Sequence, residues 1–174
     1  KACWEIMREQ AYGRVVVTTS SSGLYGNFGQ ANYGSAKMGV IGLMNTLCQE
    51  GGKYDIRVNA LAPTAGTRMT EGLIPEEAFE LLTPETVTPA VLYLVSEDAP
   101  NRTILGAGAG SFAVARIVES PGKWLPAEEQ TPEGIAEHWA EISATAGENQ
   151  PQAGVEQTMK MLGLAMEGLG IKQG

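Results

Sequence analysis

The sequence predicts an α/β protein built on a parallel sheet, because two strands of the buried type flank one long helix. Residues 14–19 and 56–62 are nearly continuous β-branched and apolar runs, typical of strands that are buried on both faces of a sheet. Residues 31–50 are predicted to form a helix that ends at the Gly51-Gly52 pair. Strand, helix and strand in this order form a βαβ unit, so the two strands are expected to be parallel.

The chain begins inside a predicted helix. Residues 1–10 place Cys3, Ile6 and Met7 on one helical face. No Ser, Thr, Asp or Asn caps this helix, and no initiator Met precedes it. We therefore expect the sequence to be a piece of a longer protein.

Beyond the second strand, a long loop leads to another helix and a last strand. Residues 64–83 are predicted to be a loop or lid with short helical pieces, since loops of this length are usually functional or mobile. A helix is predicted over residues 84–96, with Pro89 near its first turn, where proline is tolerated. Its predicted apolar positions are Val87, Val91, Leu92, Leu94 and Val95. Residues 103–107 are predicted to be the last strand, and the glycine-rich residues 106–110 a turn next to it.

The character of the chain changes after Pro121, so we predict a domain of residues 1–121 and a helical C-terminal extension of residues 122–174. In the extension, Thr131 is expected to cap a helix over residues 132–144. The predicted inner stripe of this helix is Ile135, His138, Trp139 and Ile142. His138 is the only histidine, and we expect it to be a core or edge residue, not a catalytic one. A final helix is predicted over residues 155–169.

Composition argues against several classes of function. The net charge of −8 disfavours nucleic acid as a partner, because binding to phosphates needs a basic surface. Cys3 and Cys48 form no CxxC motif and have no histidine cluster near them, so we expect no metal site. Reduced thiols of this kind indicate a cytoplasmic protein. No apolar run is long enough to cross a membrane, so no membrane association is expected.

Three polar side chains stand where an α/β fold places its chemistry. Ser20 follows the first strand at its carboxyl end, and Tyr33 and Lys37 lie four residues apart on one face of the long helix. A tyrosine with a nearby ammonium has a pKa below its usual value of about 10, which suits general acid–base catalysis. The serine hydroxyl can stabilise negative charge on a substrate oxygen. A Tyr-x3-Lys pair alone is usually an ordinary surface pair, but the combination predicts hydride transfer between an alcohol and a ketone.

The spacing Ser20-x12-Tyr33-x3-Lys37 is similar to the signature of the short-chain dehydrogenase/reductase family. Residues 22–33 (SGLYGNFGQANY) and 62–70 (APTAGTRMT) resemble, more specifically, the (3R)-hydroxyacyl-CoA dehydrogenase domain of peroxisomal multifunctional enzymes and their bacterial relatives. The resemblance covers residues 1–121, and the extension matches only loosely. It implies the C-terminal part of a doubly wound, Rossmann-type parallel sheet, followed by a helical C-terminal tail.

The resemblance also implies residue roles and a cofactor. Ser20 would orient the substrate carbonyl, and Tyr33 would be the general acid and base. Lys37 would lower the pKa of Tyr33 and bind the nicotinamide ribose. The loop after the second strand would line the nicotinamide, so the cofactor-binding set is Tyr33, Lys37, Pro63, Ala65, Gly66, Thr67 and Arg68. The implied cofactor is NAD, with NADP left open.

Part of the family pattern is missing from the sequence. The glycine-rich phosphate-binding turn, the acidic residue that selects NAD, and the helix asparagine of the proton relay would all lie upstream of Lys1. The glycines of residues 106–110 come too late and precede no βαβ unit. We therefore expect this chain alone to be inactive, and NAD-dependent turnover by it would refute that expectation.

The function implied is hydride transfer between a nicotinamide cofactor and the 3-hydroxy or 3-keto group of an acyl-CoA thioester. One alternative is a short-chain reductase of acyl-carrier-protein thioesters, steroids or other alcohols. Another is a non-catalytic interaction remnant that lacks the nucleotide half. The family's equivalent of helix 31–50, which here carries Gly39 and Gly42, implies a homodimer or homotetramer. The expected location is the cytoplasm, or the peroxisome in a eukaryote.

Overall fold

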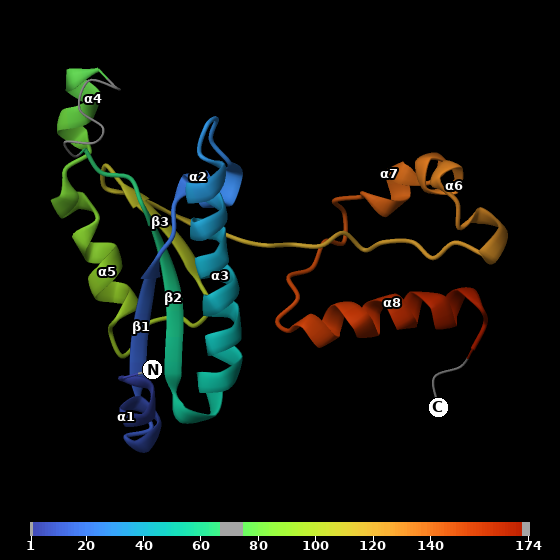
Figure 1. Cartoon of the computed structure of the whole chain (residues 1–174), viewed down its shortest axis with the longest axis horizontal. Coiled ribbons are helices and arrows are strands. Elements are labelled where there is room, and N and C mark those ends of the chain that lie inside the picture. Colours follow the sequence, from blue (N-terminus) through green and yellow to red (C-terminus); the bar gives the residue numbers. More distant parts are fainter. Residues whose placement is uncertain (1, 67–74, 172–174) are drawn as a thin grey trace. The chain divides into compact units, whose positions relative to one another are not determined.

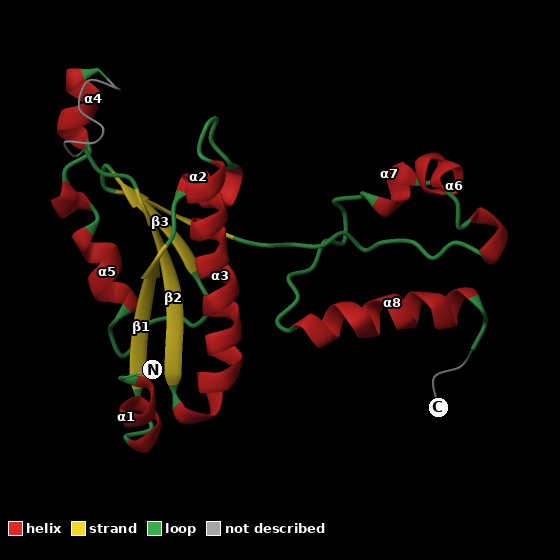
Figure 2. Cartoon of the chain, viewed as in Figure 1, coloured by secondary structure: helices red, strands yellow, loops and turns green. Residues whose placement is uncertain are grey.

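The computed structural model describes residues 2–66 and 75–171. These residues divide between two compact units, Lys1–Ala115 and Arg116–Gly174, which we name unit 1 and unit 2. Unit 1 contains the sheet, and unit 2 consists of helices joined by long loops (Figures 1 and 2). All of the predicted catalytic residues lie in unit 1.

The sheet of unit 1 has four strands in the order β1-β2-β3-β4. Their bounds are β1 (Gly13–Thr18), β2 (Ile56–Pro63), β3 (Ile104–Gly108) and β4 (Ser111–Ala115). The pairs β1–β2 and β2–β3 are parallel, which confirms the predicted βαβ unit and parallel sheet. The strand β4 runs antiparallel to β3 and was not predicted. It returns through Ala109 and Gly110, whose φ angles of 49° and 70° are those of a two-residue hairpin turn.

Helices cover both faces of this sheet, so unit 1 has three layers. Helix α3 (Ala31–Gly51) lies on one face and helix α5 (Thr88–Leu94) on the other, as Figure 1 shows. Below α3, the buried core consists of Ile41, Met44, Cys48, Ile56, Val58, Ala60 and Ile104. Below α5, it consists of Leu61, Val87, Ala90, Leu94 and Ala107. Helix α1 (Trp4–Glu9) packs Trp4 and Met7 against the α3 core.

Two predictions for unit 1 differ from the structure: the burial of the first strand and the continuity of the helix of residues 84–96. Strand β1 was expected to be buried on both faces, but Val15, Val16 and Val17 are half-buried, because β1 is the edge strand among the described residues. The predicted helix of residues 84–96 is a short turn, η2 (Pro84–Thr86), followed by α5. Val91, Leu92 and Val95 are exposed, since only Val87, Ala90 and Leu94 have the spacing that faces the sheet.

Unit 2 contains η3 (Ala127–Glu129), α6 (Pro132–Glu137), α7 (Trp139–Ile142) and α8 (Gly154–Gly168). The predicted cap is confirmed, because the Thr131 hydroxyl accepts a hydrogen bond of 3.0 Å from the Gly134 amide. The predicted continuous helix of residues 132–144 is wrong, because it breaks at His138. There the imidazole lies between Glu129 Oε2, at 3.0 Å, and Glu141 Oε1, at 3.2 Å.

The predicted inner stripe of that helix is wrong as well. Ile135 is 48% exposed and Trp139 59% exposed, because the break at His138 turns the two short helices independently. The final predicted helix corresponds closely to α8.

Within residues 2–66 and 75–171, no helix is both long and apolar enough to span a membrane. In the same part of the chain, no three His, Cys, Asp or Glu side chains are placed to hold a metal ion.

Candidate active site

Ser20 lies directly beyond the carboxyl end of β1. It is the N-cap of a short helix, α2 (Ser21–Tyr25), with extended backbone angles (φ −160°, ψ 154°). Its hydroxyl accepts a hydrogen bond of 3.2 Å from the Ser22 amide. Serine is a favoured N-cap because its oxygen satisfies an amide that the first helical turn leaves without a partner. The cap therefore fixes the backbone at the position where the sequence predicted a substrate-orienting hydroxyl.

Tyr33 and Lys37 lie in the first two turns of α3, and the structure brings them together. The Lys37 Nζ atom is 5.7 Å from the centroid of the Tyr33 ring. The same ammonium donates a hydrogen bond of 3.0 Å to the carbonyl oxygen of Thr18, at the end of β1. Tyr33 is 44% exposed, so its ring is accessible to a ligand at this edge. The Lys37 side chain thus joins the predicted proton-transfer residue to the end of the strand that precedes Ser20.

Helix α2 packs closely against α3, and two glycines make this possible. A Cβ atom on Gly23 would lie 2.8 Å from Lys37 Cβ, and one on Gly34 would lie 2.9 Å from the Ser22 carbonyl oxygen. Real Cβ atoms are almost never found at such distances, so any side chain at either position would push the helices apart. Because Ser20 caps α2 and Tyr33 lies in the first turn of α3, this close packing sets the spacing between the two residues.

The predicted cofactor loop begins at the same edge of the sheet. Strands β1 and β2 are parallel, with Thr18 opposite Leu61, so Ser20 and Pro63 lie at equivalent ends of adjacent strands. The amide of Thr64 donates to the carbonyl oxygen of Ala107 at 2.8 Å. Gly66 lies so close to Phe79, in α4 (Glu76–Leu81), that a Cβ atom would be 3.0 Å from the ring. Of the predicted loop residues, Pro63, Ala65 and Gly66 are described.

The other two predicted cofactor residues, Thr67 and Arg68, lie outside the described residues. The glycines of residues 106–110 were expected to form a turn and not a phosphate site. They are in fact the end of β3 and the hairpin turn to β4, since residues 106–108 are paired with residues 111–113. Gly108 is packed so closely against the Thr64 carbonyl that no side chain would fit. This segment therefore belongs to the sheet and packs against the predicted cofactor loop.

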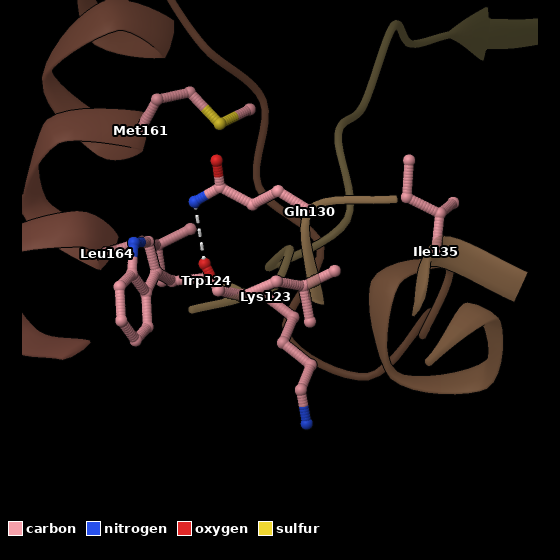
Figure 3. A pocket seen from close by; sticks show the side chains of 7 residues that line it. Lys123, Trp124, Gln130, Ile135, Met161 and Leu164 are labelled. Atoms are coloured by element: carbon pink, nitrogen blue, oxygen red, sulfur yellow. Dashed lines mark hydrogen bonds between the residues drawn. The ribbon is translucent and has the colours of Figure 1, made fainter. Parts of the chain in front are cut away.

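Unit 2 has an apolar pocket of its own, drawn in Figure 3. It is lined by Lys123, Trp124, Leu125, Gln130, Ile135, Met161 and Leu164. The Gln130 amide donates a hydrogen bond of 2.9 Å to the Leu125 carbonyl oxygen and so holds the loop that carries Trp124. The pocket contains none of the residues that the sequence singled out for catalysis, and no prediction pointed to it.

A three-layer α/β unit with a serine, a tyrosine and a lysine at the carboxyl edge of its parallel strands is typical of nicotinamide-dependent oxidoreductases. Residues 1–78 match the family model described as short chain dehydrogenase, so this part of the chain is similar to that family. The recognition made from the sequence is therefore confirmed, as is the fold class.

Individual relatives support the same assignment. A Mycobacterium tuberculosis protein named as a short-chain type dehydrogenase/reductase is 48% identical over 148 residues, which are 84% of this chain and 51% of that protein. The peroxisomal multifunctional enzyme type 2 of Mus musculus is 43% identical over 161 residues, covering 91% of this chain and 22% of the enzyme. The structure of the full-length peroxisomal multifunctional enzyme type 2 from Drosophila melanogaster matches with a TM-score of 0.84 and 33% identity, covering 97% of this chain and 31% of that one. The chain thus spans about half the length of the first of these relatives and less of the others.

Proposed function

We propose that this chain is the proton-handling part of an oxidoreductase that transfers a hydride between a nicotinamide cofactor and the 3-hydroxy or 3-keto group of an acyl-CoA thioester. The observation that carries this proposal is the Tyr33–Lys37 pair, which is held against the end of β1 by the bond from Lys37 Nζ to the Thr18 carbonyl. The thioester class is supported by the name of another relative, the acetoacetyl-CoA reductase of Acinetobacter sp., which is 43% identical over 103 residues. Ser20 lies at the same edge of the sheet and completes the set.

The three side chains have separate roles in the proposed reaction. A nicotinamide cofactor bound beside these residues would supply the hydride chemistry at the substrate carbon, in either direction. Tyr33 Oη takes the hydroxyl proton in oxidation and gives it back in reduction. Ser20 Oγ donates a hydrogen bond to the substrate oxygen, where negative charge develops. The Lys37 ammonium lies near the Tyr33 ring and is held there by its hydrogen bond to the Thr18 carbonyl.

The described residues suit one half of the cofactor. An ammonium has three hydrogens, and Lys37 uses one of them on Thr18, so two remain for the ribose hydroxyls next to the nicotinamide. Pro63, Ala65 and Gly66 begin the loop that would line the ring, with Thr67 and Arg68 following in sequence. The proposed cofactor is NAD, and NADP stays an alternative.

We propose that the adenosine half of the cofactor is bound by residues outside this chain. The glycines of residues 106–110 belong to a hairpin and offer no helix N-terminus to a pyrophosphate. Strand β1 also supports the proposal that part of the cofactor site lies outside this chain. Its three valines are typical of an inner strand, yet they are half-buried. Upstream strands of an intact protein would pair with its free edge, and residues 1–121 would complete one domain.

A substrate panel with the intact protein that contains this chain tests the proposal. We expect a 3-hydroxyacyl-CoA to be oxidised with a kcat/KM at least about tenfold above acyl-carrier-protein thioesters or steroid alcohols, measured by nicotinamide absorbance with NAD and with NADP. This chain alone is expected to show no turnover. A preference for a steroid or another alcohol would support the alternative reductase. Absence of both turnover and cofactor binding would support the interaction remnant.

We also propose that the outer face of α3 is a homodimer interface. Met38 is 40% exposed and Leu43 51% exposed on this helix, and a Cβ atom on Gly39 or Gly42 would meet nothing within 4 Å. The two glycines would let the equivalent helix of a second copy approach closely across a two-fold axis. A homotetramer would need a second interface.

The proposed location is the peroxisome in a eukaryote and the cytoplasm in a bacterium.

Replacing Leu43 by arginine is expected to convert the dimer into a monomer, because a charge would be buried without a partner at the interface. The measurement is the molar mass of the intact protein by light scattering. Leu92→Arg is the matched control, since Leu92 is 62% exposed on α5, on the other face of the sheet. A wild-type monomer, or a mass that Leu43→Arg leaves unchanged, would contradict the interface.

A further inference from the structure

Thr19 is a buried hydroxyl next to the candidate site, and no sequence pattern singled it out. Its exposed fraction is 2%, and Thr19 and Asn59 are the buried polar residues among those described. Asn59 serves the fold, since its amide bridges the Pro100 carbonyl and the Thr103 amide. Thr19 instead contacts α3, because its Oγ1 atom donates a hydrogen bond of 2.8 Å to the carbonyl oxygen of Lys37.

The backbone around Thr19 is anchored to the sheet. The Thr19 amide donates a hydrogen bond of 2.8 Å to the Leu61 carbonyl oxygen of β2. One residue earlier, the Thr18 carbonyl accepts the hydrogen bond from Lys37 Nζ. Lys37 is therefore held at two points by adjacent residues, its main chain by Thr19 and its ammonium by Thr18. The next residue in the chain is Ser20.

This geometry couples the two sides of the candidate site. A shift of α3 along the sheet would stretch the Thr19–Lys37 bond, and a shift of α2 is blocked where Gly23 meets Lys37 Cβ. A buried hydroxyl without a partner costs free energy, so the bond also disfavours any arrangement that leaves Thr19 unpaired. Valine has nearly the same shape and would pack equally well after the three valines of β1. The property that only the hydroxyl adds is the donor to Lys37.

We propose that Thr19 is a positioning residue that holds Tyr33 and Lys37 in register with Ser20. The role rests on the proposed function, since Thr19 acts on the reaction only through Lys37 and Ser20. Because Thr19 is buried, no direct contact with substrate or cofactor is part of the proposed role. Its effect is expected in the turnover step, where small displacements of acid–base groups are costly.

Thr19→Val in the intact protein tests this role. We expect kcat to fall about 10- to 100-fold, a larger change than any rise in KM for substrate or cofactor, because the displaced groups act mainly in proton transfer. Thr19→Ser keeps the donor and is expected to restore most of kcat. Thr86→Val is the matched control, since the Thr86 hydroxyl also donates to a main-chain carbonyl, that of Thr83, at 2.7 Å. A kcat for Thr19→Val within about twofold of wild type, or equal losses for Val and Ser, would overturn the proposal.

Two further measurements separate this proposal from the proposed function. Tyr33→Phe is assayed beside Thr19→Val, so loss of activity in the first with full activity in the second rejects only the positioning role. Amide hydrogen exchange of residues 20–38 needs no substrate. It is expected to accelerate in Thr19→Val but not in Thr86→Val, while amides of β2 exchange as in wild type. Unchanged exchange in residues 20–38 would reject the positioning role even if no substrate is turned over.

Discussion

Replacing Tyr33 by phenylalanine is expected to lower kcat of the intact protein by about 10²- to 10⁴-fold, the contribution typical of a positioned general acid or base. The substitution removes one oxygen atom and keeps the ring that lies 5.7 Å from Lys37 Nζ. Because Tyr33 is 44% exposed, loss of its hydroxyl leaves no buried polar group unpaired. The free energy of unfolding is therefore expected to stay close to that of wild type. The measurements are steady-state kinetics and urea unfolding.

Kinetics can distinguish proton transfer from binding in this variant. If Tyr33 moves a proton in the transition state, kcat and kcat/KM fall together, whereas a binding role alone would raise KM. Tyr25→Phe is the matched control, because Tyr25 lies in α2 near the site, is 77% exposed and has no role in the proposed chemistry. Activity of Tyr33→Phe close to that of Tyr25→Phe would refute the mechanism, whatever the substrate.

Local patterns were sufficient to predict the central part of unit 1. The spacing of Tyr33 and Lys37 is a property of one helix, and the structure brings them together because α3 forms over the predicted residues. The parallel pairing of β1 and β2 followed from the βαβ order alone. Ser20 at the end of β1 followed from the same reasoning. Each of these depends on residues close together in the sequence.

Features that depend on distant neighbours could not be predicted in this way. Strand β4 exists because it pairs with β3, and its own residues carry no strong strand signal. In the sequence, Thr19 is an ordinary hydroxyl residue at the end of a strand. Its hydrogen bond to the Lys37 carbonyl becomes evident only from the position of α3 in the fold. The broken helix at His138 depends on Glu129 and Glu141, which meet the imidazole from opposite sides. The sequence identified the apolar positions of α5 but could not show which of them the sheet would cover.

Substitutions in α5 can test which of its apolar residues the sheet covers. Leu94→Ala is expected to lower the free energy of unfolding by about 2–5 kcal/mol, as is usual when a buried leucine leaves a cavity. Leu94 is 0% exposed and packs in the core with Leu61, Val87, Ala90 and Ala107. The measurement is urea unfolding followed by circular dichroism, with the m-value checked for a change in the denatured state.

Leu92→Ala is the control for Leu94→Ala, because it removes the same atoms two residues away on the same helix. Leu92 is 62% exposed, so the loss is expected to stay within about 0.5 kcal/mol. Hydrophobicity alone does not distinguish these leucines, and the sequence identifies both simply as apolar positions of the helix. If both variants lose stability equally, the outer face of α5 must be covered in the folded protein, and the burial described for this helix would be wrong. A large difference would instead show that contact with the sheet, and not apolar character, determines what each leucine contributes.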